Sequence, residues 1–429
     1  MQSLRRRDAL ALLATGTIAG LAGCSSSCPD SDDPEPDASV RRPSDPAGFD
    51  SLPGGDWPAP RYDAGNTGYA PDGAIPTGSV AVRWRATPPT APVNEVFYRA
   101  SSPTVADERV LVSTGAGVTA LTLRDGTRVW TTDVVSPGTV RATHGYDEEI
   151  VPPVVGDDTV FVAGRSELVA LALADGTERW RYAAAAPVGI PVVADGTVVL
   201  DTERETVALD ASDGTERWTA TVGGGRSVPA VADGAVVLQA EGLAGERTLA
   251  TAALDLVDGA ERWRTGAVAE FYPVVADGNV YLGSYEGLFC YALADGTRRW
   301  RIDRGSGRSL SSPVVTPDTL YLAERPGESG DAAFAFDRTD GTPTPRWCSS
   351  LGEATVPCAT DDHALVLEGS PGGPGESRPS LVAFTAGLGD ALWGLGGRNR
   401  VLPPAILDGA VVLTDEDGRV FALGGADGG

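Results

Sequence analysis

The sequence predicts an all-β fold, a closed β-propeller of eight blades with four antiparallel strands in each. Eight tryptophans recur at spacings of 37 to 50 residues, a period typical of propellers and solenoids. Most of them follow a tight-turn phrase such as Asp175-Gly176-Thr177. The first and last repeats are incomplete in complementary ways, so the two chain ends can complete one blade. The eight tryptophans are Trp84, Trp130, Trp180, Trp218, Trp263, Trp300, Trp347 and Trp393.

The segment 191–218 shows the unit that repeats. Asp195-Gly196 and Asp213-Gly214 are turns, because glycine accepts the positive φ that tight hairpins require. Between and beside them lie short runs rich in β-branched residues, which are typical of strands. The four predicted strands are 191–194, 197–200, 206–209 and 216–218. Four short antiparallel strands make one propeller blade.

Closure of the ring depends on residues 80–84. Trp84 has no complete repeat before it, and the last segment, 403–423, supplies three strands but no tryptophan. We therefore expect the strand around Trp84 to be the fourth strand of the last blade. Pairing the two ends removes the exposed sheet edges that an open array would leave.

A second spacing links each tryptophan to two small residues. Ala208, Gly214 and Trp218 stand at positions one, seven and eleven of their repeat, and several other repeats match them. The spacing resembles the tryptophan-docking motif of the PQQ-like repeat, or quinoprotein dehydrogenase-like, propellers. That resemblance covers residues 57–429 and implies that the indole of one blade stacks on its neighbour. Two copies differ: Cys290 replaces the alanine before Trp300, and the Trp347 copy carries two extra residues.

Residues 1–23 are predicted to be a twin-arginine lipoprotein signal peptide. Arg5-Arg6-Arg7 precedes an apolar stretch, and Leu21-Ala22-Gly23-Cys24 resembles a lipobox. Such signals are cut before the cysteine, so we expect Cys24 to carry a lipid at the extracellular face of the cell membrane. The open alternative is a plain signal peptide with an incidental cysteine. Residues 24–56 are predicted to be a disordered acidic tether, and 57–429 the propeller.

The charge is strongly acidic. The formal net charge of −25 becomes −27 when Arg5, Arg6, Arg7 and Asp8 are removed with the signal peptide. The chain contains arginines but no lysine. This balance argues against nucleic acid as a partner, because phosphate backbones need positive charge. We interpret the acidity as solvation in high salt and the composition as that of a halophilic archaeon. An acidic binding patch is the alternative.

The sequence holds few candidates for a chemical site. The loop 141–150 carries His144, Tyr146 and Glu149, which we take as a candidate binding-face loop; a solvated acidic loop is the alternative. It belongs to the variable connections, which antiparallel geometry places on the face opposite the tight turns. No spacing typical of zinc ligands occurs, so no metal site is predicted. Cys348 and Cys358 could form a disulfide or remain separate thiols.

These observations favour a noncatalytic protein. Quinoprotein dehydrogenases carry adjacent cysteines, and no two cysteines are adjacent here. The chain is more similar to the noncatalytic branch of the family, which includes the lipoprotein subunit of the outer-membrane β-barrel assembly machinery. We therefore expect a monomeric, lipid-anchored scaffold for envelope or membrane proteins, without a cofactor. The alternatives are an oxidoreductase with a divergent pyrroloquinoline quinone (PQQ) and calcium site, or a receptor for a sugar or small ligand in the central funnel.

Overall fold

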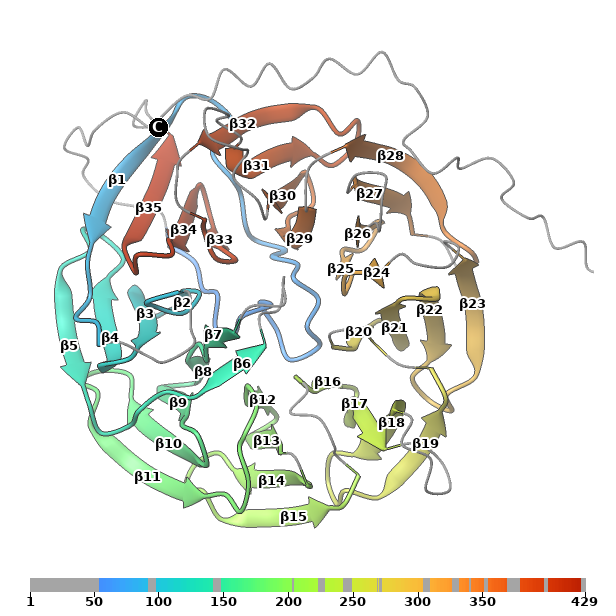
Figure 1. Cartoon of the computed structure of the whole chain (residues 1–429), viewed down its shortest axis with the longest axis horizontal. Helices are drawn as coiled ribbons and strands as arrows, with labels where there is room; N and C mark the ends of the chain where they lie inside the picture. Colours follow the sequence, from blue (N-terminus) through green and yellow to red (C-terminus); the bar gives the residue numbers. More distant parts are fainter. Residues whose placement is uncertain are drawn as a thin grey trace, which may run out of the picture.

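The computed structural model confirms the eight-bladed propeller (Figure 1). It describes residues 54–425 except 92–97, 142–147, 203, 223–227, 242–248, 268, 270–271, 304–308, 326–331, 339–340, 351–353, 369–378 and 397–399. The described residues form strands and no helix. Eight small antiparallel sheets stand around one axis, and in every blade except blade 7 the innermost strand is the shortest (Figure 1).

The strands of the first four blades run outward in chain order. Blade 1 holds β2 (Thr104–Ala106), β3 (Arg109–Thr114), β4 (Gly117–Thr122) and β5 (Arg128–Thr132). Blade 2 holds β8 (Val154–Gly156), β9 (Thr159–Ala163), β10 (Glu167–Ala172) and β11 (Glu178–Ala183). Blade 3 holds β12 (Val192–Ala194), β13 (Thr197–Asp201), β14 (Thr206–Asp210) and β15 (Glu216–Ala220). Blade 4 holds β16 (Ala230–Ala232), β17 (Ala235–Glu241), β18 (Leu249–Asp255) and β19 (Glu261–Thr265).

The other four blades follow the same plan with two departures. Blade 5 holds β20 (Val274–Ala276), β21 (Asn279–Ser284), β22 (Gly287–Ala292) and β23 (Arg298–Asp303). In blade 6, β24 (Ser309–Leu310) and β25 (Val314–Val315) both pair with β26 (Thr319–Arg325), followed by β27 (Ala332–Asp337) and β28 (Thr344–Ser350). Blade 7 holds β29 (Ala354–Ala359), β30 (His363–Glu368), β31 (Pro379–Thr385) and β32 (Ala391–Gly396). Blade 8 holds β33 (Ala405–Leu407), β34 (Ala410–Thr414), β35 (Val420–Gly425) and then β1 (Val80–Ala86).

The predicted closure of the ring is confirmed. β1 is antiparallel to β35, with Trp84 opposite Ala422 in register. The chain thus enters blade 8 as its outermost strand and returns at the end to build the three inner ones. Because both ends share one sheet, the ring is held shut by backbone hydrogen bonds.

Each of the eight repeat indoles lies between its own blade and the next. In blade 1, Trp130 stands opposite Ala120, and its Nε1 donates a hydrogen bond to the Leu173 carbonyl of blade 2 at 3.0 Å. A Cβ on Gly176 of blade 2 would lie 2.7 Å from the Trp130 ring. The small residues at positions one and seven therefore make room for the ring. Six indoles donate such a bond to the next blade: Trp84, Trp130, Trp180, Trp218, Trp263 and Trp347. Trp393 of blade 7 donates instead to the Pro76 carbonyl, in the segment before β1.

The deviating copy in blade 6 changes this packing. A Cβ on Gly341 would meet nothing within 4 Å. In the regular blades, a Cβ on each described glycine at position seven would lie within 3 Å of an indole atom. The extra residues of this turn move the glycine away from Trp300 of blade 5. The first residue after β27 is Arg338, and its guanidinium reaches across to Asp277 and Tyr281 of blade 5.

The core lies between neighbouring sheets, as alternating strands in stacked sheets require. Leu111 and Val118 of blade 1 pack with Val160 and Val169 of blade 2, and all four side chains are buried. Similar clusters join the other neighbouring blades. One segment predicted as a loop contains a hairpin, because β6 (Thr139–Arg141) pairs with β7 (Glu148–Ile150).

Candidate functional site

The axis of the propeller is occupied by the chain itself. Residues 54–76, which we call the strap, run inside the ring before β1 begins (Figure 1). The innermost strand of a blade is a sheet edge with free N–H and C=O groups, which need partners when buried. Strap carbonyls accept hydrogen bonds of 2.6 to 2.9 Å from Val105, Val155, Val231, Val275, Val315 and Ala359. In blade 8 the Ala74 N–H donates to the Leu407 carbonyl at 2.9 Å, and the Ala74 carbonyl accepts from the Gly409 N–H at 2.8 Å.

Two buried polar side chains anchor the strap. The Asn66 amide nitrogen donates to the carbonyls of Pro229 at 2.9 Å and Pro273 at 3.2 Å. Arg61 donates to the Asn66 carbonyl at 3.1 Å and to the Pro313 carbonyl. Its guanidinium lies 5.2 Å from the centre of the Tyr272 ring. Neutral carbonyl dipoles and a ring face therefore stabilise this buried cation.

The carbonyls that these side chains contact belong to a repeated proline. A proline stands directly before the inner strand in seven blades and at the bulge within β29 of blade 7. The eight are Pro103, Pro153, Pro191, Pro229, Pro273, Pro313, Pro357 and Pro404. Proline suits the start of an edge strand because it has no N–H to satisfy. The motif can be read in the sequence, yet the tryptophan spacing alone does not reveal it.

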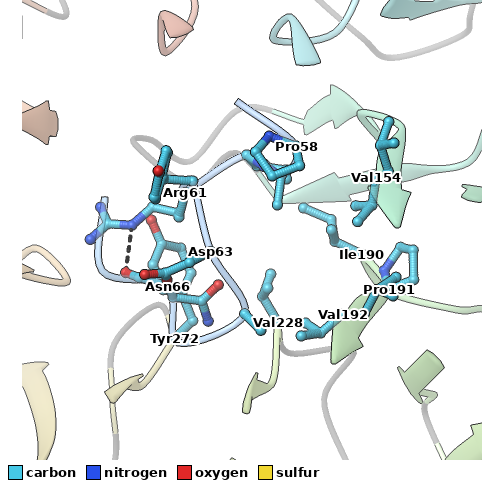
Figure 2. A pocket seen from close by; sticks show the side chains of 16 residues that line it. Pro58, Arg61, Asp63, Asn66, Val154, Ile190, Pro191, Val192, Val228 and Tyr272 are labelled. Carbon is cyan, nitrogen blue, oxygen red and sulfur yellow. Dashed lines mark hydrogen bonds between the residues drawn. The ribbon is translucent and has the colours of Figure 1, made fainter. Parts of the chain in front are cut away.

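A small cavity lies between the strap and blade 3. Its volume is about 60 Å³. Pro58 of the strap forms one wall, and Ile190, Pro191 and Val192 form the wall beside β12 (Figure 2). Arg61, Asp63 and Asn66 of the strap also belong to its lining (Figure 2). The other lining residues are mainly apolar.

A larger and more polar hollow lies beside the tight turns of blades 4 to 6. Its volume is about 450 Å³, and its polar lining includes Asp63, Thr67, Tyr69, Asp233, Asp277 and Arg338. The Arg338 guanidinium forms an ion pair with Asp277 at 2.5 Å and donates to the Thr316 carbonyl at 2.9 Å. Its charge is therefore already compensated within the protein.

Burial raises the pKa of Asp63, the deepest carboxyl of this hollow. Hydrogen bonds from the Thr67 N–H at 2.9 Å and the Thr67 hydroxyl at 2.6 Å act in the opposite direction. Burial also raises the pKa of the Tyr69 phenol, whose hydroxyl donates to Asp361 at 2.6 Å. The hollow is acidic, with three carboxyl groups and one arginine.

The structure places few of the sequence-predicted site residues at these sites. His144, Tyr146 and Cys24 lie outside the described residues. Glu149 lies in β7 with only 2% of its surface exposed, so its carboxylate is not presented to a partner. Cys358 is a free buried thiol 3.8 Å from the Pro404 carbonyl, so it forms no bridge to Cys348.

A quinone cofactor does not fit either space. Sites for molecules of that size need about 300 Å³ or more. The cavity under the strap is several times smaller, and residues of the strap take up the axis. The hollow is large enough, but its carboxylates would repel PQQ, which itself carries several carboxylates. Among the described residues no group of three or more His, Cys, Asp or Glu side chains could hold a metal ion.

Comparison with known proteins gives one family and several solved structures. A family profile described as outer membrane protein assembly factor BamB matches residues 74–187 and 116–342. No curated protein matches the sequence. BamB from Moraxella catarrhalis is 15% identical, with a TM-score of 0.46, and the match covers 74% of this chain and 82% of that chain.

Two further solved structures are quinohemoprotein alcohol dehydrogenases. The enzyme from Pseudomonas putida HK5 is 14% identical, with a TM-score of 0.63, and the match covers 86% of this chain and 80% of that chain. The enzyme from Comamonas testosteroni is 15% identical, with a TM-score of 0.62, and the match covers 87% and 81%. Identities this low show a shared fold alone.

Proposed function

This chain belongs to the family described as outer membrane protein assembly factor BamB, and from that premise we propose that it is a noncatalytic scaffold for envelope or membrane proteins. One observation carries the proposal: the strap binds the inner edges of seven blades and takes up the axis. The space where a propeller could hold a large ligand is used for internal packing. The outer faces remain as the main surface for partners.

We propose further that a lipid on Cys24 holds the protein at the extracellular face of the membrane. The motif Leu21-Ala22-Gly23-Cys24 supports this. Within the described part of the chain, no helix is long and apolar enough to cross a membrane. If the predicted tether of about 30 residues behaves as a random coil, it would span roughly 30 Å.

The attachment point of the tether favours one face for partner binding. The Gly54 carbonyl accepts a hydrogen bond of 3.3 Å from Asp408 N–H, in the tight turn between β33 and β34. The tether therefore joins the propeller on the face of the tight turns. The opposite face carries the variable connections, where repeat proteins commonly bind partners.

The test is affinity purification of the full-length protein from its native membranes in high salt. Tyr285 lies between β21 and β22 on the variable-connection face, and Leu388 lies in a tight turn on the other face. Both side chains are exposed, by 48% and 79%. We expect a stoichiometric partner that Tyr285→Arg loses and Leu388→Arg keeps. Loss only with Leu388→Arg, or the lack of any stoichiometric partner, would contradict the proposal.

The acidic hollow favours a second candidate, a receptor for a small ligand. Its volume of about 450 Å³ lies in the usual range for small-molecule sites. Carboxylates, hydroxyls and one guanidinium suit a polyhydroxylated or cationic ligand. Titration calorimetry with neutral sugars and primary amines tests this candidate. Dye reduction after reconstitution with PQQ and calcium tests the oxidoreductase alternative, for which we expect no turnover.

A further inference from the structure

Blade 3 is the one described blade whose inner strand the strap leaves unpaired. The Pro58 carbonyl accepts from Val155 of blade 2 at 2.8 Å, and the Ala64 carbonyl accepts from Val231 of blade 4 at 2.6 Å. Between them the strap makes a turn in which Tyr62 N–H donates to the Ala59 carbonyl at 3.0 Å. This turn lifts the backbone off β12, the inner strand of blade 3.

The open donor on β12 is the N–H of Val193. Val193 lies opposite Val198 in the register of β12 and β13. Val155 and Val231 hold the same register position in the blades on either side, opposite Val160 and Val236. Both of those donate inward to the strap, so the N–H of Val193 also faces the axis. No described strap carbonyl accepts it.

The cavity of about 60 Å³ lies beside this donor. Val193 and Val228 belong to its lining, together with the proline and valine walls of Figure 2. A volume of this kind holds about four waters or one branched aliphatic side chain. Apolar cavities favour apolar groups over water. The site thus combines one backbone donor with a cavity whose wall beside blade 3 is apolar, while Arg61, Asp63 and Asn66 contribute to the lining from the strap.

We infer that this site, which we call the blade 3 edge, receives one residue of an extended apolar segment of a partner protein. The carbonyl of that residue accepts the hydrogen bond from Val193 N–H, and its side chain fills the cavity. The occupant is a polypeptide because the blade 3 edge continues the interface that the strap backbone makes with blades 2 and 4. The inference rests on the proposed scaffold function.

The experiment uses the full chain labelled with ¹⁵N-valine. The probe is the uncharged peptide acetyl-Gly-Gly-Leu-Gly-Gly-amide, added up to the millimolar range. The Val193 amide signal is expected to shift with saturation. The Val231 amide, already bonded to the strap, and the amide of Val257, which is 82% exposed on an outer turn, are expected to stay unchanged.

A matched pair of variants locates the site. Val228→Trp fills the cavity and is expected to weaken probe binding by at least about tenfold. Val257→Trp adds the same indole to the surface and is expected to leave binding unchanged. If Val228→Trp lowers the melting temperature, Ala59→Leu, which adds a smaller side chain to the strap wall, replaces it. The inference is overturned by an unmoved Val193 signal, by equal shifts at Val257, or by undiminished binding in the filled variant.

The copurification experiment separates the blade 3 edge from the scaffold function. A stoichiometric partner that copurifies equally with wild type and Val228→Trp keeps the scaffold and removes the blade 3 edge. The lack of any partner, with a saturable Val193 shift, leaves a peptide site without the wider proposal.

Discussion

Two glycines of blade 3 separate the strain of a tight turn from the packing of a tryptophan. Gly196 and Gly214 each follow an aspartate in a tight turn, with φ of 67° and 74°. A Cβ on Gly214 would lie 2.5 Å from Cε3 of Trp180, whereas a Cβ on Gly196 would meet nothing closer than Arg217 at 3.9 Å. Gly196→Ala is therefore the matched control for Gly214→Ala.

The expected costs follow from these distances. Placing alanine at positive φ costs about 1 kcal/mol at both positions. Only Gly214→Ala also forces the Trp180 ring away, which strains its 3.1 Å hydrogen bond to the Ala211 carbonyl. Overpacking of this kind costs about 1–3 kcal/mol. The free energy of unfolding should fall by roughly 1 kcal/mol in Gly196→Ala and roughly 2–4 kcal/mol in Gly214→Ala.

The assay is denaturation by guanidinium chloride, followed by tryptophan fluorescence and circular dichroism. A double-mutant cycle adds a direct measure of the contact. In a Trp180→Ala background the ring is absent, so Gly214→Ala should cost no more than Gly196→Ala does. Equal losses in the two single variants, or an unchanged cost of Gly214→Ala without the ring, would refute the docking argument.

Four further outcomes are expected. Trp218→Ala should lower the free energy of unfolding by about 3–5 kcal/mol, because its indole is 8% exposed and bonded to blade 4; an unchanged thermal melt would contradict this. Deletion of residues 77–86 should expose β35 and cause aggregation, so a monomer of wild-type stability in light scattering would argue against closure by β1. The hydroxyls of Thr122 and Thr127 lower the pKa of Asp125 to about 2, below its ordinary 3.8, so its stabilising effect should disappear as pH falls from about 4 to about 2; denaturation midpoints of Asp125→Asn should lack this part of the acid dependence. Cys24→Ser should lose stable membrane association, and retention after a high-salt wash would show that another segment is the anchor.

The regular part of the fold was predictable because its period repeats. Blade number, the tight turns and the place of β1 follow from spacings between chemically distinct residues, and the structure has Asp195 and Gly196 at the positive φ that the turn requires. The proline before each inner strand carries the same kind of signal. It could have shown which strand of each blade lies next to the axis.

The candidate site was not predictable in the same way. Asn66 binds carbonyls 163 and 207 residues away, and a single irregular segment has no period to reveal such contacts. The loop that carries Glu149 illustrates the converse. Its sequence suggests an exposed acidic surface, yet β6–β7 pairing buries that carboxylate.

The eight-bladed ring follows from local patterns, because hydrophobic period, turn chemistry and tryptophan spacing repeat along the chain. The path of the strap along the axis, and the inner edge that it leaves open at blade 3, follow instead from contacts made in the folded ring. The strap is irregular, so its path depends on which of its carbonyls each inner strand binds. That pairing is set only when all the blades are assembled around it. The turn from Ala59 to Tyr62 leaves the N–H of Val193 without a strap carbonyl because blades 2 and 4 bind the strap on either side of that turn.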